Sequence, residues 1–347
     1  MLRHCKLFFS FSLIIYLLTS PAQAFDAENY FKGKRITIVL GYGAGGTYGK
    51  TSLLLTEFLG KNIPGNPTLI KQHMPGAGGL KAANYAANAM PKNGLFLLMP
   101  PDMMVVSQIL RPKKVKFNSS NFTWLGRVFG SNNLLVVRRD SGVNNFEDTK
   151  TKMVILGGTG KGSPTYIVPG LAKGLLGAKF KQVQGYKGSA GSRKAMEQGE
   201  VQGVALAWAA WKNGHPQWFK GGNKSFAVGI LQSGFKRDKD LPNIPLIREL
   251  VTTPEQKAAA DLIATNSLLG RGLALPPGAP TEVVGVLRKA FWKTVNDPVF
   301  VKEAKRRRLP HLPMNGANMQ KTINKLLSDM SPEAIKTARN AIFPQKK

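Results

Sequence analysis

The sequence contains little cysteine, little histidine and few acidic residues. Its one cysteine is Cys5, close to the N-terminus, and four histidines occur among 347 residues. A disulfide framework or a thiolate metal site needs several cysteines, so neither is expected. No cluster of His, Asp and Glu has the spacing of a metal site either. We therefore expect no metal and no other cofactor.

The scarcity of acidic residues makes the chain strongly basic. It has 49 lysines and arginines against 19 acidic residues, which gives a formal net charge of +30. Such a charge attracts anions, among them organic acids, nucleic acids and anionic membrane surfaces. The basic residues are scattered, however, and the dense run at residues 305–308 has no aromatic residues interleaved for base stacking. We expect no nucleic-acid partner, and a basic surface or nucleic-acid-binding protein is kept as an alternative.

Long apolar runs are also missing, except near the N-terminus. Basic residues at positions 3–6 precede an apolar run at residues 7–18, and Ala22-Gln23-Ala24 is a small-residue cleavage site. The run is too short to span a bilayer comfortably. We predict a signal peptide over residues 1–24, cleaved after Ala24, and a mature protein in the bacterial periplasm.

The chain is organised around a glycine-rich turn at residues 41–47. An apolar run at residues 36–40 leads into it, and apolar residues at helical spacing follow from Leu54 to Ile63. This order predicts a buried parallel strand, a tight turn and a helix. The free N–H groups at a helix start carry roughly half a positive charge, so they favour a phosphate or a carboxylate. Such a site needs no arginine.

Two nucleotide-binding motifs overlap the same turn. The pattern G-x-G-x-x-G at residues 41–46 fits the dinucleotide (Rossmann) fingerprint, and A-x-x-x-x-G-K-T at residues 44–51 fits a loose P-loop. The first needs an acidic residue after the second strand, but residues 71–74 contain none. The second needs an acidic residue directly after a strand, and two prolines separate Asp102 from the strand predicted at 95–99. Both motifs are therefore alternatives to a cradle for a small carboxylate.

Strands and helices alternate along the chain, which predicts the α/β class with mostly parallel sheets. A second unit of apolar strand, glycine turn and helix lies at residues 153–165. There Ser163 suits a helix cap and Pro164 suits the first helical position. Two such turns, one in each of two domains, would hold an anion between two positive helix ends.

Seven ordered blocks resemble one known family, the solute-binding receptors of tripartite tricarboxylate transporters, also called Bug-type receptors. The resemblance covers nearly the whole mature chain. The blocks are residues 43–46 (GAGG), 74–79 (MPGAGG), 91–94 (PKNG), 162–164 (GSP), 186–189 (YKGS), 241–245 (LPNIP) and 274–278 (ALPPG).

The resemblance implies a two-lobed periplasmic-binding-protein fold of type II, with each lobe a mostly parallel sheet flanked by helices and a ligand cleft between the lobes. We expect a discontinuous first lobe over residues 25–130 and 228–347, and a second lobe over residues 131–227. The family implies capture of a small organic anion, such as a carboxylate, and delivery to an inner-membrane permease. We expect a monomer.

The predicted ligand-binding residues belong to the two glycine turns and to segments that follow strands. They are Tyr42, Gly43, Ala44, Gly45, Gly46, Thr47, Pro101, Asp102, Thr159, Gly160, Gly162, Ser163, Thr165, Ala207 and Trp208. Many family members carry Asp, His and an acidic residue at the positions of Gly49, Tyr166 and Ala207. The aromatic residues Tyr48 and Trp211 are further candidates for the pocket wall.

An enzymatic function is not expected. A hydrolase needs a nucleophile with a neighbouring base, and the histidines at 73, 215 and 311 stand in unremarkable contexts. Ser163 lies in a glycine loop, but its surroundings do not form the G-x-S-x-G nucleophile motif.

Overall fold

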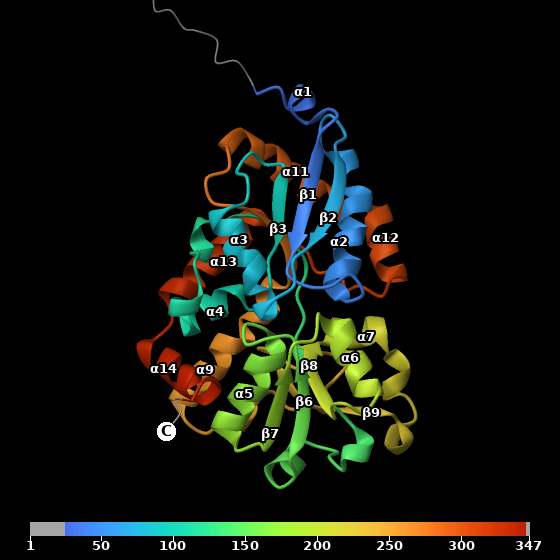
Figure 1. Ribbon diagram of the computed structural model, residues 1–347, viewed down its shortest axis with the longest axis vertical. Helices are drawn as coiled ribbons and strands as arrows, with labels where there is room; N and C mark the ends of the chain where they lie inside the picture. The colour runs from blue at the N-terminus through green and yellow to red at the C-terminus, as the bar shows by residue number, and fades with distance from the viewer. Residues whose placement is uncertain (1–24, 345–347) are drawn as a thin grey trace, which may run out of the picture.

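The computed structural model describes residues 25–344, which form two lobes stacked along the long axis of the molecule (Figure 1). Each lobe is built on one β-sheet with helices on its faces. The predicted signal peptide lies outside the described residues. Within residues 25–344, no helix has the length and apolarity needed to cross a membrane.

The first lobe contains a six-stranded sheet. Its strands, in spatial order, are β11 (Met314–Asn315), β4 (Thr123–Phe129), β10 (Arg271–Leu275), β3 (Phe96–Met99), β1 (Arg35–Leu40) and β2 (Thr68–His73). The central strand β1 is buried from Ile36 to Leu40, as expected for a strand with helices on both faces. β1 pairs in parallel with β2 and β3, whereas β10 and β4 run antiparallel to their neighbours.

The second lobe contains a five-stranded sheet. Its strands, in spatial order, are β7 (Phe180–Gln184), β6 (Val154–Gly158), β8 (Gly203–Ala207), β5 (Asn133–Arg138) and β9 (Ala227–Ser233). β6 is parallel to β7 and β8, and β5 is antiparallel to β8 and β9.

The two-lobed α/β prediction is confirmed, but both sheets are mixed rather than mostly parallel. The strands of the βα units end at the cleft between the lobes. A strand that enters a lobe from the other one starts at the cleft, so it must run in the opposite direction. β5 enters the second lobe in this way after β4, and β10 enters the first lobe on the return.

Helices cover both sheets. Those of the first lobe are α1 (Ala27–Phe31), α2 (Thr47–Phe58), α3 (Leu80–Asn88), α4 (Met104–Leu110), α11 (Thr281–Asn296), α12 (Pro298–Arg306) and α13 (Gly316–Ser328). Those of the second lobe are α5 (Pro164–Leu176), α6 (Ser189–Glu197), α7 (Trp208–Gly214), α8 (Ile247–Leu250), α9 (Pro254–Ala264) and α14 (Pro332–Ile342), and α10 (Asn266–Leu269) lies before the return to the first lobe.

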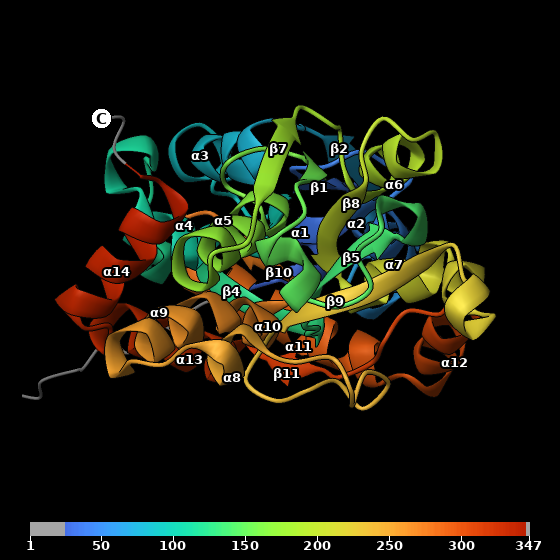
Figure 2. The ribbon, with the colours of Figure 1, turned by 90° about the horizontal axis from the view of Figure 1, so that it is seen from below.

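The boundaries of the lobes differ from the expected ones. β9 pairs with β5 along its length, so residues 227–233 belong to the second sheet. α9 and the C-terminal helix α14 pack side by side and against α5 (Figure 2). The strand that rejoins the first sheet is β10, about forty residues after the expected return near residue 228. Apolar faces on β9, α9 and α14 complete the core of the second lobe, which explains why these segments stay there.

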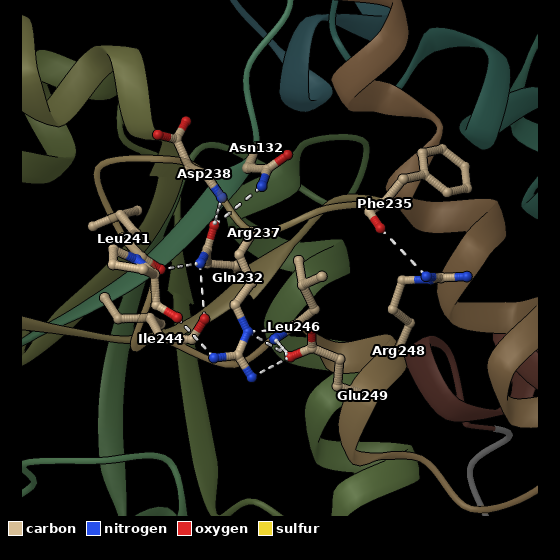
Figure 3. Close-up of polar contacts among 11 residues, drawn as sticks. Asn132, Gln232, Phe235, Arg237, Asp238, Leu241, Ile244, Leu246, Arg248 and Glu249 are labelled. Carbon is tan, nitrogen blue, oxygen red and sulfur yellow. Dashed lines mark hydrogen bonds and ion pairs between the residues drawn. The ribbon is translucent and has the colours of Figure 1, made fainter.

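A buried glutamine holds the loop after β9 in the second lobe. Gln232 is fully buried, and its side-chain amide donates to the carbonyl oxygens of Leu241 (2.9 Å) and Ile244 (2.8 Å). Its side-chain oxygen accepts from Asn132 (3.1 Å) and from the backbone N–H of Asp238 (3.0 Å) (Figure 3). All hydrogen-bonding capacity of this buried amide is therefore used to order one loop.

Two crossings between the lobes run side by side. A Cβ on Gly130 would lie 2.0 Å from the carbonyl oxygen of Ser267, and one on Gly270 would lie 1.9 Å from that of Phe129. Gly270 also has a positive φ of 55°. Only glycine permits this close approach of two backbones.

Candidate functional site

Two pairs of turns face each other across the cleft. In the first pair, the turn between β1 and α2 meets the turn between β7 and α6. The backbone N–H of Gly43 donates to the carbonyl oxygen of Lys187 at 2.8 Å, and Gly46 lies against the hydroxyl of Ser189. Glycine at these positions lets the backbones of the two lobes come into contact.

In the second pair, the turn between β2 and α3 meets the turn between β6 and α5. A Cβ on Gly78 would lie 2.6 Å from the backbone nitrogen of Ser163, and one on Gly160 would lie 2.5 Å from that of Gly78. Gly78 and Gly160 have φ of 71° and 135°, values that L side chains rarely adopt. The lobes are therefore closed on each other through glycine-rich backbone.

The facing turns enclose a cavity between the lobes. Its lining combines the starts of α2, α5 and α6 with residues that follow β1, β3 and β6. The last two residues of β8, one residue of α7 and the first residue of β10 complete it. The lining residues are Tyr42, Gly46, Tyr48, Asp102, Thr159, Ser163, Pro164, Thr165, Ser189, Leu206, Ala207, Ala210 and Arg271. The cavity volume is about 30 Å³, enough for roughly one or two water molecules. A larger solute would enter only after the lobes part.

The first lobe contributes a buried ion pair to the cavity. The guanidinium Nη1 of Arg271 lies 2.5 Å from Oδ2 of Asp102, and both residues are about 5% exposed. The hydroxyl of Tyr48 donates to the other carboxylate oxygen of Asp102. The Tyr48 ring also lies under the guanidinium, 4.2 Å from its centre, in a cation–π contact.

Burial and the Asp102 charge shift the pKa of Arg271 in opposite directions, but they shift the pKa values of the two tyrosines in the same direction. Burial lowers the pKa of Arg271, but Asp102 together with Tyr48 and Tyr42 outweighs this effect and the pKa is raised, so the guanidinium stays charged. Burial, reinforced by Asp102, raises the pKa of Tyr48 and of Tyr42 well above the usual value. Both hydroxyls are therefore neutral donors, and Tyr42 uses its own on the carbonyl oxygen of Gly78 (2.8 Å).

The second lobe contributes a chain of hydroxyl groups. The Ser163 hydroxyl lies 2.8 Å from the carbonyl oxygen of Gly160 and 2.5 Å from the Thr165 hydroxyl. Thr165 in turn accepts from the backbone N–H of Thr159 at 2.9 Å. These hydroxyls fix the shape of the glycine turn before α5.

The starts of α2 and α5 are not capped by side chains. Gly46 is the N-cap residue of α2 and has no side chain to offer. Ser163 is the N-cap of α5, but its hydroxyl makes no cap hydrogen bond. The first N–H groups of α2 have no partner within the helix. At the start of α5, Pro164 has no N–H, and the N–H groups of Ser163 and Tyr166 donate to the carbonyl oxygens of Gly160 and Ser163, which leaves the N–H of Thr165 as the free donor. Both helix starts contribute positive potential at the cavity.

The structure brings part of the predicted site together. Tyr42, Gly46, Asp102, Thr159, Ser163, Thr165 and Ala207 line the cavity. Gly43, Ala44, Gly45, Thr47, Pro101, Gly160, Gly162 and Trp208 do not. Gly43, Gly160 and Gly162 instead form the backbone contacts between the lobes.

Trp208 has a structural role in the second lobe. Its indole N–H donates to the carboxylate of Asp240 at 3.1 Å, in the loop that Gln232 anchors. Among the three departures from the family pattern, Ala207 lines the cavity, whereas Tyr166 stacks on Phe343 with ring centroids 5.6 Å apart. A Cβ on Gly49 would lie 1.8 Å from the carbonyl oxygen of Ala44, so this turn admits no side chain there.

Arg271 was not predicted, although it lines the cavity. Residues 268–275 have the sequence LLGRGLAL, in which Arg271 is the single charged residue of an otherwise apolar strand. This isolated charge could have identified Arg271 as a candidate. A charged group inside a buried strand needs a partner, and Asp102 was already a candidate. Pro164, Ser189, Leu206 and Ala210 also line the cavity without having been predicted.

Residues 58–336 match the sequence model of one family, which is described as the tripartite tricarboxylate transporter family receptor. The chain belongs to this family. Receptors of these transporters are solute-binding proteins that work with a membrane permease, so this receptor is a transport protein and not an enzyme. No curated protein matches the chain significantly.

Solved structures of similar proteins show the same fold. The periplasmic binding protein BugD is 18% identical with a TM-score of 0.69, and the match covers 89% of this chain and 97% of BugD. Rpa4515 of R. palustris with adipate is 18% identical with a TM-score of 0.67, covering 88% and 97%. MatC (Rpa3494) from Rhodopseudomonas palustris with bound malate is 18% identical with a TM-score of 0.65, covering 86% and 99%.

Proposed function

We propose that this receptor binds a small organic carboxylate in the cavity between its lobes and delivers it to an inner-membrane permease. The carboxylate is held by the uncapped starts of α2 and α5, one from each lobe. Closure of the lobes then completes the site and shields the bound anion from water.

One observation carries this proposal: two helix starts without side-chain caps line the same cavity. Gly46 at the start of α2 and Ser163 at the start of α5 both belong to its wall. The start of α2 offers several N–H donors and the start of α5 offers the N–H of Thr165, and each start carries about half a positive charge, so an anion placed between them meets both. Related structures described with adipate and malate support a carboxylate as the class of ligand.

The closed lobes and the paired crossings support a binding cycle of opening and closing. The cavity is too small to admit a metabolite while the lobes touch, so the ligand must enter an open form. The adjacent crossings at Gly130 and Gly270, together with the third crossing between α13 and α14, are where a hinge would act, because few residues need to change conformation there. We propose that the receptor works as a monomer, since both helix starts come from one chain.

Calorimetry tests the proposal. The mature chain from residue 25 is titrated with mono-, di- and tricarboxylates, with ATP and NAD as controls for the P-loop and dinucleotide alternatives. Binding of a carboxylate, with a higher melting temperature in its presence, is expected. Binding of the nucleotides alone would overturn the receptor assignment of this cavity.

A separate experiment tests the cellular location of the protein. We propose export to the periplasm with cleavage after Ala24. Mass spectrometry of the protein from a periplasmic extract should give a chain that begins at Phe25. A chain that keeps residues 1–24 in the cytoplasmic fraction would contradict the proposal.

A further inference from the structure

The charged side chains that line the cavity are one acid and one base, and they are paired with each other. Asp102 and Arg271 are 2.5 Å apart, and the remaining lining residues are neutral. The side chains of the cavity therefore contribute no net charge. The positive potential that remains comes from the two helix starts.

Arg271 has the features of a carboxylate-binding residue, but its guanidinium is already paired with a carboxylate of the protein. Its guanidinium is buried on the Tyr48 ring and offers one Nη atom to Asp102, while its Nε is buried without a hydrogen-bond partner. A guanidinium binds carboxylates with two parallel hydrogen bonds where it can. Asp102 satisfies part of this capacity from within the protein.

We propose that Asp102 occupies Arg271 in place of a second ligand carboxylate and thereby restricts this receptor to monocarboxylates with a short uncharged chain. This inference rests on the proposed function of the cavity. One carboxylate fits between the starts of α2 and α5. A second carboxylate on the same ligand would have no free cationic partner, because Arg271 is paired with Asp102.

Electrostatics gives the reason for the restriction. A second carboxylate that approached Arg271 would also approach the Asp102 carboxylate, and two carboxylates in a shared site repel each other. Burial of a charge without a partner is costly, and no other cationic side chain of the described residues lines the cavity. The uncharged part of the ligand instead meets apolar groups of Leu206, Ala207 and Ala210 in the second lobe.

The wild-type protein provides the first test. Affinities are measured for pairs of equal chain length: propionate with malonate, butyrate with succinate, and hexanoate with adipate. The monocarboxylate of the best pair should bind about tenfold tighter or more. If the dicarboxylates bind as tightly, the proposed function stands and the restriction is overturned. If no carboxylate binds, the proposed function itself fails and the restriction falls with it.

The second test frees Arg271. Asp102→Asn keeps the shape of the side chain but removes its charge, so Arg271 gains the capacity to bind a ligand carboxylate. The ratio of dicarboxylate to monocarboxylate affinity should rise about tenfold or more relative to wild type. The double variant Asp102→Asn/Arg271→Gln removes both charges and should show no such rise.

A matched control separates the local effect from the change in net charge. Asp140→Asn removes an exposed carboxylate of the second lobe, which is paired with Arg138 on the surface, and should leave the affinity ratio unchanged. Circular dichroism and the melting temperature establish that each variant is folded. A folded Asp102→Asn variant that binds monocarboxylates with an unchanged ratio would overturn the proposal. If Asp102→Asn does not fold, the wild-type pairs still decide whether the receptor is restricted to monocarboxylates.

Discussion

The two lobes build opposite walls of one cavity with different chemistry. The first lobe contributes a charged and aromatic wall, in which Arg271, Asp102 and Tyr48 satisfy one another. The second lobe contributes a wall of hydroxyl and small apolar groups, in which Ser163 and Thr165 bond to their own backbone turn. Both walls hold a helix start, but charge is confined to the first.

This difference between the walls separates the binding of a carboxylate from the selection among different ligands. The helix starts are backbone features, which provide donors for any carboxylate and do not distinguish one chain length or charge from another. Side chains must provide that distinction, and the charged ones lie in the first lobe. Variants of the first wall should therefore change both stability and the choice of ligand, whereas variants of the second wall should have smaller effects.

The largest expected effect is on stability, for Arg271→Met in the first wall. Removal of the guanidinium leaves Asp102 buried without its cationic partner, and the free energy of unfolding should fall by about 3–5 kcal/mol. Urea denaturation measures this difference. The matched control is Lys150→Met in the second lobe, which breaks an exposed pair with Glu147 and should cost less than about 1 kcal/mol. Equal losses in both variants would contradict the distinction between the walls.

Gly78→Ala tests the contact between the lobes. Gly78 and the control Gly33 have nearly equal φ, 71° and 69°, but a Cβ on Gly33 would have nothing within 4 Å. Both alanine variants should lose about 1–2 kcal/mol through left-handed strain. Only Gly78→Ala should also hold the lobes apart, because its Cβ would meet the backbone of Ser163.

Small-angle scattering and calorimetry distinguish the two glycine variants. Gly78→Ala should have a larger radius of gyration and weaker ligand binding than Gly33→Ala. Identical behaviour of the two would show that the closed contact is not needed for binding.

Ser163→Ala tests what the wall of the second lobe contributes to stability and to ligand binding. The hydroxyl bonds to the Gly160 carbonyl and the Thr165 hydroxyl, so its loss should reduce the free energy of unfolding by about 1 kcal/mol. The affinity for the best carboxylate should fall with it, while the preference between mono- and dicarboxylates should not change. A changed preference would place part of the ligand selection in the second lobe.

The smallest expected effect concerns pH and His215 at the end of α7. Burial, together with the nearby positive charge of Arg193, lowers the pKa of His215 in the folded protein. The unfolded chain then binds the proton more readily, so stability is retained above about pH 6.5 and decreases as the pH falls below this value. The melting temperature of wild type should decrease between pH 7 and 5 slightly more than that of His215→Gln. Parallel curves would contradict this assignment.

Much of the site could be predicted from the sequence alone, because it depends on interactions between neighbouring residues. The apolar run at 36–40 is β1, the glycine turn after it leads into α2, and Ser163-Pro164 opens α5. These features depend on neighbouring residues, because glycine, proline and strand-forming residues impose their geometry over a few positions. The same reasoning placed Asp102 just beyond the third strand, at the edge where such sheets bind ligands.

Only the tertiary structure decided which distant segments meet. Arg271 and Asp102 are 169 residues apart, and no local pattern pairs them. β9 joined the second sheet because its hydrogen-bonding and apolar partners are there, although its sequence suits a strand in either lobe. Gly78 and Ser163 touch only because the lobes close. A sequence pattern specifies the conformation of a segment, whereas its partners depend on the packing of the whole chain, and that packing places the ion pair in the cavity.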